Sequence, residues 1–279
     1  MTTRGEHWLA QRLATGLAAV LLVVTVAGWC MAAPLVIMPL GDSNTSGTPK
    51  ATGAYRTKLW QNFGSDPARV AFLGTRQSGP PELGDQLHEG HSGFTIAAAP
   101  VGLGNLTDNI GSYLGRRKNP DVILLMIGTN DVNLDYQVDE APARLDQLIS
   151  QISDLATGLK PQAKLFVANA PPIDDVHNQF RTGTDTMANS RAIAFNATIP
   201  GIVAAHRARS ELVYFVDVNR ELTLADVDDG LHPTPVGFDK IGDAFYRAIV
   251  GVPEPNCAVY LCAAFGWGLC LRRQVASLG

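Results

Sequence analysis

The stretch LVIMPLGDS, residues 35–43, decides the fold of this chain. It opens with a short apolar run, Leu35–Leu40, and ends with Gly41-Asp42-Ser43, which is typical of a tight turn. A run that is apolar throughout fits a strand buried on both faces, as in a parallel sheet. The stretch therefore predicts a buried strand that carries Ser43 at its carboxyl end.

Four further apolar runs predict strands, and amphipathic segments between them predict helices. The strands are Arg69–Thr75, Val122–Ile127, Lys164–Ala168 and Val213–Val218. The helices are Ala54–Phe63, Pro142–Leu159, the region around Met187–Arg209, and Phe238–Ile249. Apolar strands that alternate with such helices indicate a parallel sheet covered on both faces. The predicted fold class is α/β, a flavodoxin-like, three-layer α/β/α domain with a five-stranded parallel sheet.

Composition limits the classes of function. The chain has 279 residues, 46% of them hydrophobic and 17% charged, which suits one large globular domain rather than a disordered chain. Its 22 Lys and Arg face 26 Asp and Glu, for a net charge of −4, and no basic run stands out. We therefore expect no nucleic-acid partner and no electrostatic binding to an anionic membrane, and we expect a monomer.

The first 33 residues differ from the rest of the chain. A charged start is followed by the apolar run Leu13–Ala33 and then by Pro34. This order is typical of a secretory signal peptide, although the run is also long enough for an uncleaved N-terminal anchor. Either reading predicts that the domain at residues 34–251 is exported, and the sequons at Asn105 and Asn196 are compatible with export.

Cysteines are confined to the two ends of the chain. Cys30 lies in the leader, and the tail at residues 252–279 holds Cys257, Cys262 and Cys270, whose pairing the sequence leaves open. The domain between them has no cysteine, so it must fold without disulfides or a thiolate metal site. The tail has no assigned role.

Three polar residues are placed to form a nucleophile and its base. A serine hydroxyl attacks a carbonyl when a base takes its proton, and that base is usually a histidine oriented by a carboxylate. Asp229-Gly-Leu-His232 supplies both groups from one loop, after the strand at Val213–Val218. Ligands of such sheets bind beyond the carboxyl ends of the strands, so we expect Ser43, Asp229 and His232 to meet there.

The same edge of the sheet offers an oxyanion hole. Asn130 follows the strand at Val122–Ile127 and can donate from its side-chain amide. Gly93 closes the segment Ser78–Gly93, which is rich in Gly, Pro, Asp and His and is predicted to be a long irregular loop. The backbone N–H groups of Gly93 and Ser43 would complete the hole. This chemistry requires no metal and no cofactor.

Four motifs in this order resemble a known superfamily. They are Gly41-Asp42-Ser43, Gly93, Gly128-Thr-Asn130-Asp131 and Asp229-Gly-Leu-His232-Pro233. They resemble the signature blocks of the SGNH (GDSL-type) hydrolases. The residues around these motifs are most similar to the carbohydrate esterase family that contains acetyl xylan esterases. The resemblance implies that Ser43, Gly93, Asn130 and His232 are the name-giving residues and that Asp229 is the aspartate of the last block. Asn44 departs from the pattern.

The segment Ser78–Gly93 allows two other interpretations. Ser92 lies in Gly90-His-Ser-Gly-Phe94, which is similar to a nucleophile elbow but lacks the last glycine and a preceding strand. Asp85, His88, Glu89 and His91 could form a metal cluster, but crowding in one loop favours polar contacts or solvation.

The sequence thus leads to one main hypothesis and two alternatives. The main hypothesis is a secreted serine esterase that hydrolyses short O-acyl esters of carbohydrate, such as acetylated xylan, through a Ser43 acyl-enzyme. Its polysaccharide substrate follows from the resemblance alone. The alternatives are a lipase- or thioesterase-type GDSL hydrolase and a catalytically inactive carbohydrate-binding surface protein.

Overall fold

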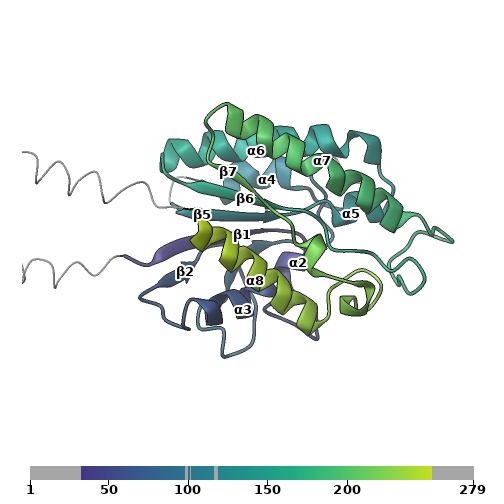
Figure 1. Ribbon diagram of the computed structural model, residues 1–279, viewed down its shortest axis with the longest axis horizontal. Coiled ribbons are helices and arrows are strands. Elements are labelled where there is room, and N and C mark those ends of the chain that lie inside the picture. The colour runs from purple at the N-terminus through teal and green to yellow at the C-terminus, as the bar shows by residue number, and fades with distance from the viewer. Residues whose placement is uncertain (1–32, 98–99, 101, 116–118, 253–279) are drawn as a thin grey trace, which may run out of the picture.

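The computed structural model describes residues 33–97, 100, 102–115 and 119–252 (Figure 1). The strands are β1 (Leu35–Gly41), β2 (Val70–Phe72), β3 (Arg76–Gln77), β4 (Leu87–Gly90), β5 (Val122–Met126), β6 (Lys164–Ala168) and β7 (Val213–Val216). The helices are α2 (Ser43–Ser46), α3 (Tyr55–Asn62), α4 (Leu106–Tyr113), α5 (Thr129–Asn133), α6 (Ala141–Leu159), α7 (Ala188–Ala208) and α8 (Pro235–Gly251). None of these helices is long and apolar enough to cross a membrane. Apart from its last residue, the predicted signal peptide lies outside the described residues, as does all but the first residue of the tail.

All five predicted strands are present, and the sheet has two more. Strands β2, β1, β5, β6 and β7 pair in parallel in that order, so β1 lies between β2 and β5. The extra strands β3 and β4 arise from the segment 76–90, most of which was predicted to be irregular. β4 runs parallel to the end of β1, and β3 is antiparallel to β4. The sheet is therefore mainly parallel with seven strands, and the prediction of an irregular loop was wrong for β4.

Helices cover both faces of the sheet, as predicted. Alternate residues of each strand enter two separate apolar cores: Met38 and Leu40 face one core, and Ile37 faces the other. The first core is closed by α4, α6 and α7, and the second by α3 and α8. Figure 1 shows these two groups of helices above and below the sheet. The three-layer α/β/α architecture is confirmed.

Two adjacent parallel strands, β1 and β5, each run straight into a short helix at the same edge. α2 begins at Ser43 after β1, and α5 begins at Thr129 after β5. The ends of β1 and β5 lie close together: a Cβ atom added at Gly41 would lie only 2.0 Å from the carbonyl oxygen of Met126. The fold thus brings Ser43 and Asn130 to one edge of the sheet.

The sequons at Asn105 and Asn196 do not offer free asparagine side chains. Asn105 is 7% exposed, and its Oδ1 caps α4 by accepting the N–H of Asp108 at 2.9 Å. Asn196 is 8% exposed and bonds to both the N–H and the carbonyl of Ala170, each at 2.9 Å. Neither sequon therefore supports the predicted export.

Candidate active site

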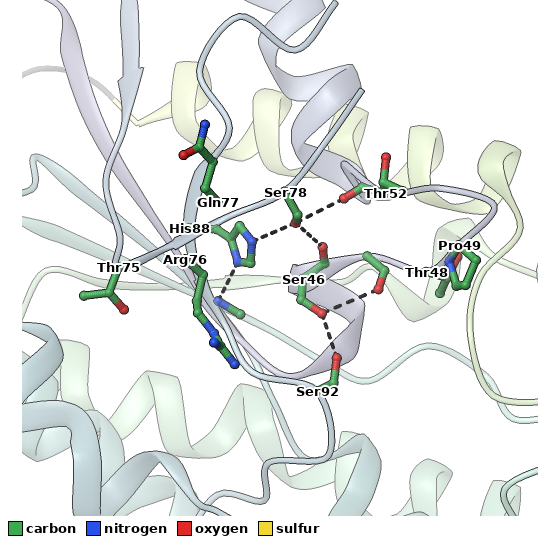
Figure 2. A pocket seen from close by; sticks show the side chains of 12 residues that line it. Ser46, Thr48, Pro49, Thr52, Thr75, Arg76, Gln77, Ser78, His88 and Ser92 are labelled. Atoms are coloured by element: carbon green, nitrogen blue, oxygen red, sulfur yellow. Dashed lines mark hydrogen bonds between the residues drawn. The ribbon is translucent and has the colours of Figure 1, made fainter. Parts of the chain in front are cut away.

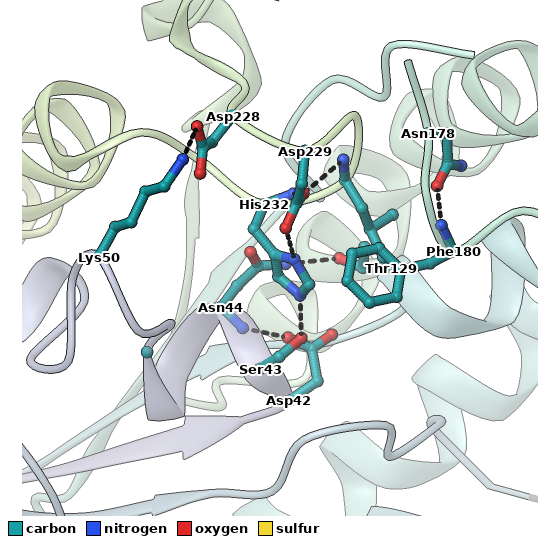
Figure 3. Close-up of polar contacts among 12 residues, drawn as sticks. Asp42, Ser43, Asn44, Lys50, Thr129, Asn178, Phe180, Asp228, Asp229 and His232 are labelled. Atoms are coloured by element: carbon teal, nitrogen blue, oxygen red, sulfur yellow. Dashed lines mark hydrogen bonds and ion pairs between the residues drawn. The ribbon is translucent and has the colours of Figure 1, made fainter. Parts of the chain in front are cut away.

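Ser43, His232 and Asp229 form a continuous chain of hydrogen bonds at the carboxyl edge of the sheet (Figure 3). The Oγ of Ser43 lies 2.9 Å from Nε2 of His232. The Nδ1 of the same imidazole lies 2.9 Å from Oδ2 of Asp229. In the tautomer that this geometry favours, Nδ1–H donates to the carboxylate and Nε2 accepts the serine proton. The structure thus brings together the three residues that the sequence singled out.

The Asp229-Gly-Leu-His232 loop fixes its own carboxylate. Oδ1 of Asp229 accepts the backbone N–H groups of Leu231 and His232 at 3.0 and 2.8 Å, so Oδ2 is left for the imidazole. Gly230 has φ +87°, and a Cβ there would lie 2.2 Å from the backbone of Asn178, so the turn requires glycine. Burial raises the pKa of Asp229, but the hydrogen bonds from His232 and Leu231 outweigh it. The net pKa lies below its usual value, and Asp229 is ionised at neutral pH.

The turn that presents Ser43 is tied to α5. Asp42 caps α2, with its Oδ1 accepting the N–H of Asn44 at 2.8 Å. The Asn44 amide donates to Oγ1 of Thr129 at 3.0 Å, so the residue that departs from the family pattern links α2 to the helix of Asn130. Asp42 is fully buried, and this burial raises its pKa to about 7 against the opposing hydrogen bond from Asn44.

Three hydrogen-bond donors border the same cavity as Ser43 Oγ. Asn130 donates one amide hydrogen to the carbonyl of Phe94 at 2.8 Å, which leaves its second amide hydrogen for a ligand. Gly93 has φ +81°, and a Cβ there would meet only the Leu103 side chain, at an ordinary contact distance of 3.6 Å, so conformation rather than crowding selects glycine there. Within the described ranges, the backbone N–H groups of Gly93 and Ser43 donate to no protein carbonyl. The predicted members of the oxyanion hole therefore lie in one place.

His91 supports this arrangement, and the sequence analysis missed that role. Its ring is stacked between Phe94 and Tyr113, with centroid separations of 4.7 and 4.6 Å. Its Nε2 lies 2.9 Å from the buried carboxylate of Glu89. Its backbone N–H donates to Gly41 at 2.9 Å, and its carbonyl accepts the N–H of Phe94 at 3.1 Å. The loop that carries Gly93 is thereby anchored to β1.

The side chains of the segment 78–93 that could form a second nucleophile or a metal site have other partners. Ser92 Oγ lies 3.0 Å from Ser46 Oγ rather than against a histidine. Of the four acidic and histidine side chains only Glu89 and His91 meet, because His88 contacts Ser78 and Asp85 accepts the backbone N–H of Phe72 at 2.6 Å. In the part of the chain that the structure describes, no group of three or more His, Cys, Asp or Glu is arranged to hold a metal ion.

A cavity of about 550 Å³ opens over Ser43. Its polar lining includes the Ser43 hydroxyl, the His232 imidazole and the Asn130 amide, and its apolar wall includes Leu103, Leu134 and Phe180. The Phe180 ring meets the His232 imidazole edge-on, with centroids 5.0 Å apart and planes at 87°. An ester can therefore place its carbonyl among donors and its acyl group against the apolar wall.

A serine with its histidine and aspartate at the carboxyl edge of a parallel sheet is the arrangement of a serine hydrolase. Residues 40–240 match the model of the GDSL-like lipase/acylhydrolase family, and the chain belongs to that family. It is accordingly a carboxylic ester hydrolase, as the sequence predicted.

Two solved structures and one further esterase are similar to this chain. The solved family 3 carbohydrate esterase of Clostridium thermocellum is 32% identical, with a TM-score of 0.62 over 78% of this chain and 96% of that one. The family 3 carbohydrate esterase of Talaromyces cellulolyticus is 24% identical, with a TM-score of 0.60 over 78% and 97%, and supports the fold alone. A multidomain esterase of Ruminococcus flavefaciens is 28% identical over 241 residues, which are 79% of this chain. This chain spans only 29% of the length of that multidomain esterase.

Proposed function

We propose that this protein is a carbohydrate O-acetylesterase that removes acetyl groups from a polysaccharide such as acetylated xylan. One observation carries the proposal: the hydrogen-bonded chain from Ser43 through His232 to Asp229 ends in a cavity that also holds the Asn130 amide. The similarity to a carbohydrate esterase at 32% identity supports the choice of a sugar ester.

In the proposed reaction Ser43 is the nucleophile and His232 the base. As Ser43 Oγ bonds to the ester carbonyl carbon, its proton passes to Nε2 of His232, 2.9 Å away. The oxyanion accepts hydrogen bonds from the Ser43 and Gly93 N–H groups and from Asn130. The sugar oxygen then leaves with the proton from His232, and Ser43 remains acetylated. In the second half of the reaction His232 takes a proton from water while the water oxygen bonds to the acetyl carbon. The same proton then passes from His232 to Ser43 Oγ as the bond between that oxygen and the acetyl carbon breaks, and acetic acid leaves and ionises to acetate.

Asp229 is the positioning partner of the base. Its two oxygens have separate tasks, because Oδ1 is held by backbone N–H groups while Oδ2 faces Nδ1 of His232. An ionised Asp229 stabilises the imidazolium that forms when His232 takes the serine proton. No metal or cofactor enters this sequence of steps.

A lipase- or thioesterase-type activity is the second candidate, favoured by the apolar wall of Leu103, Leu134 and Phe180. Hydrolysis of p-nitrophenyl acetate against p-nitrophenyl esters of longer acids separates the two. A preference for acetate, with acetate release from acetylated xylan exceeding that from other acetylated polysaccharides, supports the first proposal. A rate that rises with acyl length supports the second, and absence of hydrolysis with retained glycan binding supports an inactive binding protein.

We also propose that the catalytic domain, residues 34–251, is exported as a monomer by the leader at residues 1–33. A polymeric substrate cannot readily enter a cell, so a polysaccharide esterase has to be outside it. N-terminal sequencing of protein from the culture medium tests cleavage near Ala33. Full-length protein in the membrane fraction would instead support an anchor, and light scattering tests the monomer.

A further inference from the structure

A polar groove of about 540 Å³ lies beside the cavity that contains Ser43 (Figure 2). One side comes from α2 and the turn after it, and the other from β3 and β4. Thr48, Pro49 and Ser92 line both the groove and the cavity over Ser43, so the two spaces adjoin. A substrate whose ester reaches Ser43 can therefore extend into the groove.

Apart from Arg76, the side chains that line the groove are uncharged, and two of them, Ser78 and His88, are hydrogen-bonded to each other. Ser78 Oγ lies 2.9 Å from the carbonyl of Ser46 and 2.8 Å from Nε2 of His88. Burial, followed by the nearby Arg56 charge, lowers the pKa of His88 to about 3, so its ring is uncharged at neutral pH. Such a wall offers little to an apolar ligand and no counter-ion to a charged neighbour.

Arg76 gives the lining of the groove a positive charge. Among the described residues that line the groove, it alone is charged at neutral pH, and it forms no ion pair with any described residue. In Figure 2 its guanidinium lies toward the same end of the groove as Ser92, which also borders the Ser43 cavity. A guanidinium has five donors and no acceptor, and its planar fork matches a carboxylate. The neighbouring Gln77 adds an amide.

We propose that this groove binds the glycan chain of the substrate and that Arg76 pairs there with the carboxylate of a uronic acid residue. The inference rests on the proposed carbohydrate esterase function and makes it more specific. Hydroxyl and ring oxygens of a sugar suit the polar wall, and an acidic sugar is the class of glycan that gains most from a free guanidinium. The enzyme should therefore prefer acetylated glycans with acidic side groups over neutral ones.

Two acetylated xylo-oligosaccharides that differ only in one uronic acid side group test this preference. Arg76→Gln should lower kcat/KM on the acidic oligosaccharide by about three- to tenfold, the range expected for a partly exposed ion pair. The same variant should keep its kcat/KM on the neutral oligosaccharide and on p-nitrophenyl acetate. Arg69→Gln is the matched control, because Arg69 is also exposed but pairs with Asp66 outside the groove. Arg76→Glu should deepen the loss on the acidic substrate.

Binding separates this inference from the proposed function. The unacetylated acidic oligosaccharide is titrated by calorimetry into Ser43→Ala, with and without Arg76→Gln. Affinity that exceeds that of the neutral oligosaccharide and falls with Arg76→Gln supports the groove, even if the enzyme releases no acetate from glycan. Equal affinity for both oligosaccharides, or an Arg76→Gln effect of the same size on both, overturns it.

Discussion

Replacing Asn130 by alanine removes one of the three proposed oxyanion donors. The variant loses two hydrogen bonds of different kinds. The bond to the Phe94 carbonyl, 2.8 Å long, exists in the free protein, and its loss should cost about 1 kcal/mol of folding stability. The second amide hydrogen serves the transition state, and losing one such donor typically costs about 3–4 kcal/mol of transition-state stabilisation. We therefore expect kcat to fall by about 10²–10³ while KM changes little.

The assay is steady-state hydrolysis of p-nitrophenyl acetate, with thermal unfolding measured in parallel. Asn196→Ala is the control, since Asn196 is equally buried but bonds only to the backbone N–H and carbonyl of Ala170, each at 2.9 Å, and does not line the cavity over Ser43. Its loss of stability should be at least as large and its loss of kcat no more than a few-fold. A near-normal kcat in Asn130→Ala, or equal losses in both variants, would show that Asn130 is only a cap at the end of β5.

Substitutions at three further residues test the groups around the nucleophile. Asp229→Asn should lower kcat by about 10²–10⁴, less than His232→Ala does, because it disturbs the tautomer without removing the base; an unchanged kcat would reduce the site to a Ser43–His232 pair. His91→Ala should displace Gly93 and so lower kcat by about 10–100-fold, with KM nearly constant. His91→Phe should recover part of the rate, because a phenyl ring restores the stack with Phe94 and Tyr113. If His91→Ala lowered only the thermal stability, His91 would be a structural residue without a role in positioning Gly93. Asp42 has a folded-state pKa raised from 3.8 to about 7, so the wild type should lose stability as pH rises from 4 to 8, by at most about 4 kcal/mol. Asp42→Asn should not show that part of the loss in denaturant titrations, and identical pH profiles would contradict the assignment.

The strongest predictions came from patterns that have one physical solution. A strand such as Leu35–Leu40, which is apolar on both faces, is stable only when both faces are covered by apolar side chains. The parallel strands and the three-layer fold followed from this pattern. The residues after those strands had to meet at one edge, which placed Ser43, Asn130 and His232 together before any distance was known. The resemblance to the SGNH hydrolases then joined Gly93 to them.

The segment between β2 and α4 was harder to predict. β3 has two residues and β4 has four, with Arg76, His88 and Glu89 among them, so neither strand has an apolar run to mark it. β4 pairs with β1, which is distant in the sequence, and β3 pairs with β4, so the contact that fixes the two strands in the sheet is not encoded by local sequence. For the same reason His91 and Glu89 could be weighed as metal ligands, whereas the fold assigns them to an aromatic stack and a buried hydrogen bond.

The central claim is that Ser43 is the nucleophile. The most direct test is to treat the protein with a fluorophosphonate and identify the modified serine by peptide mass spectrometry. We predict a single label on Ser43, loss of both labelling and esterase activity in Ser43→Ala, and retention of both in Ser92→Ala. A label on Ser92, or full esterase activity in Ser43→Ala, would contradict the account.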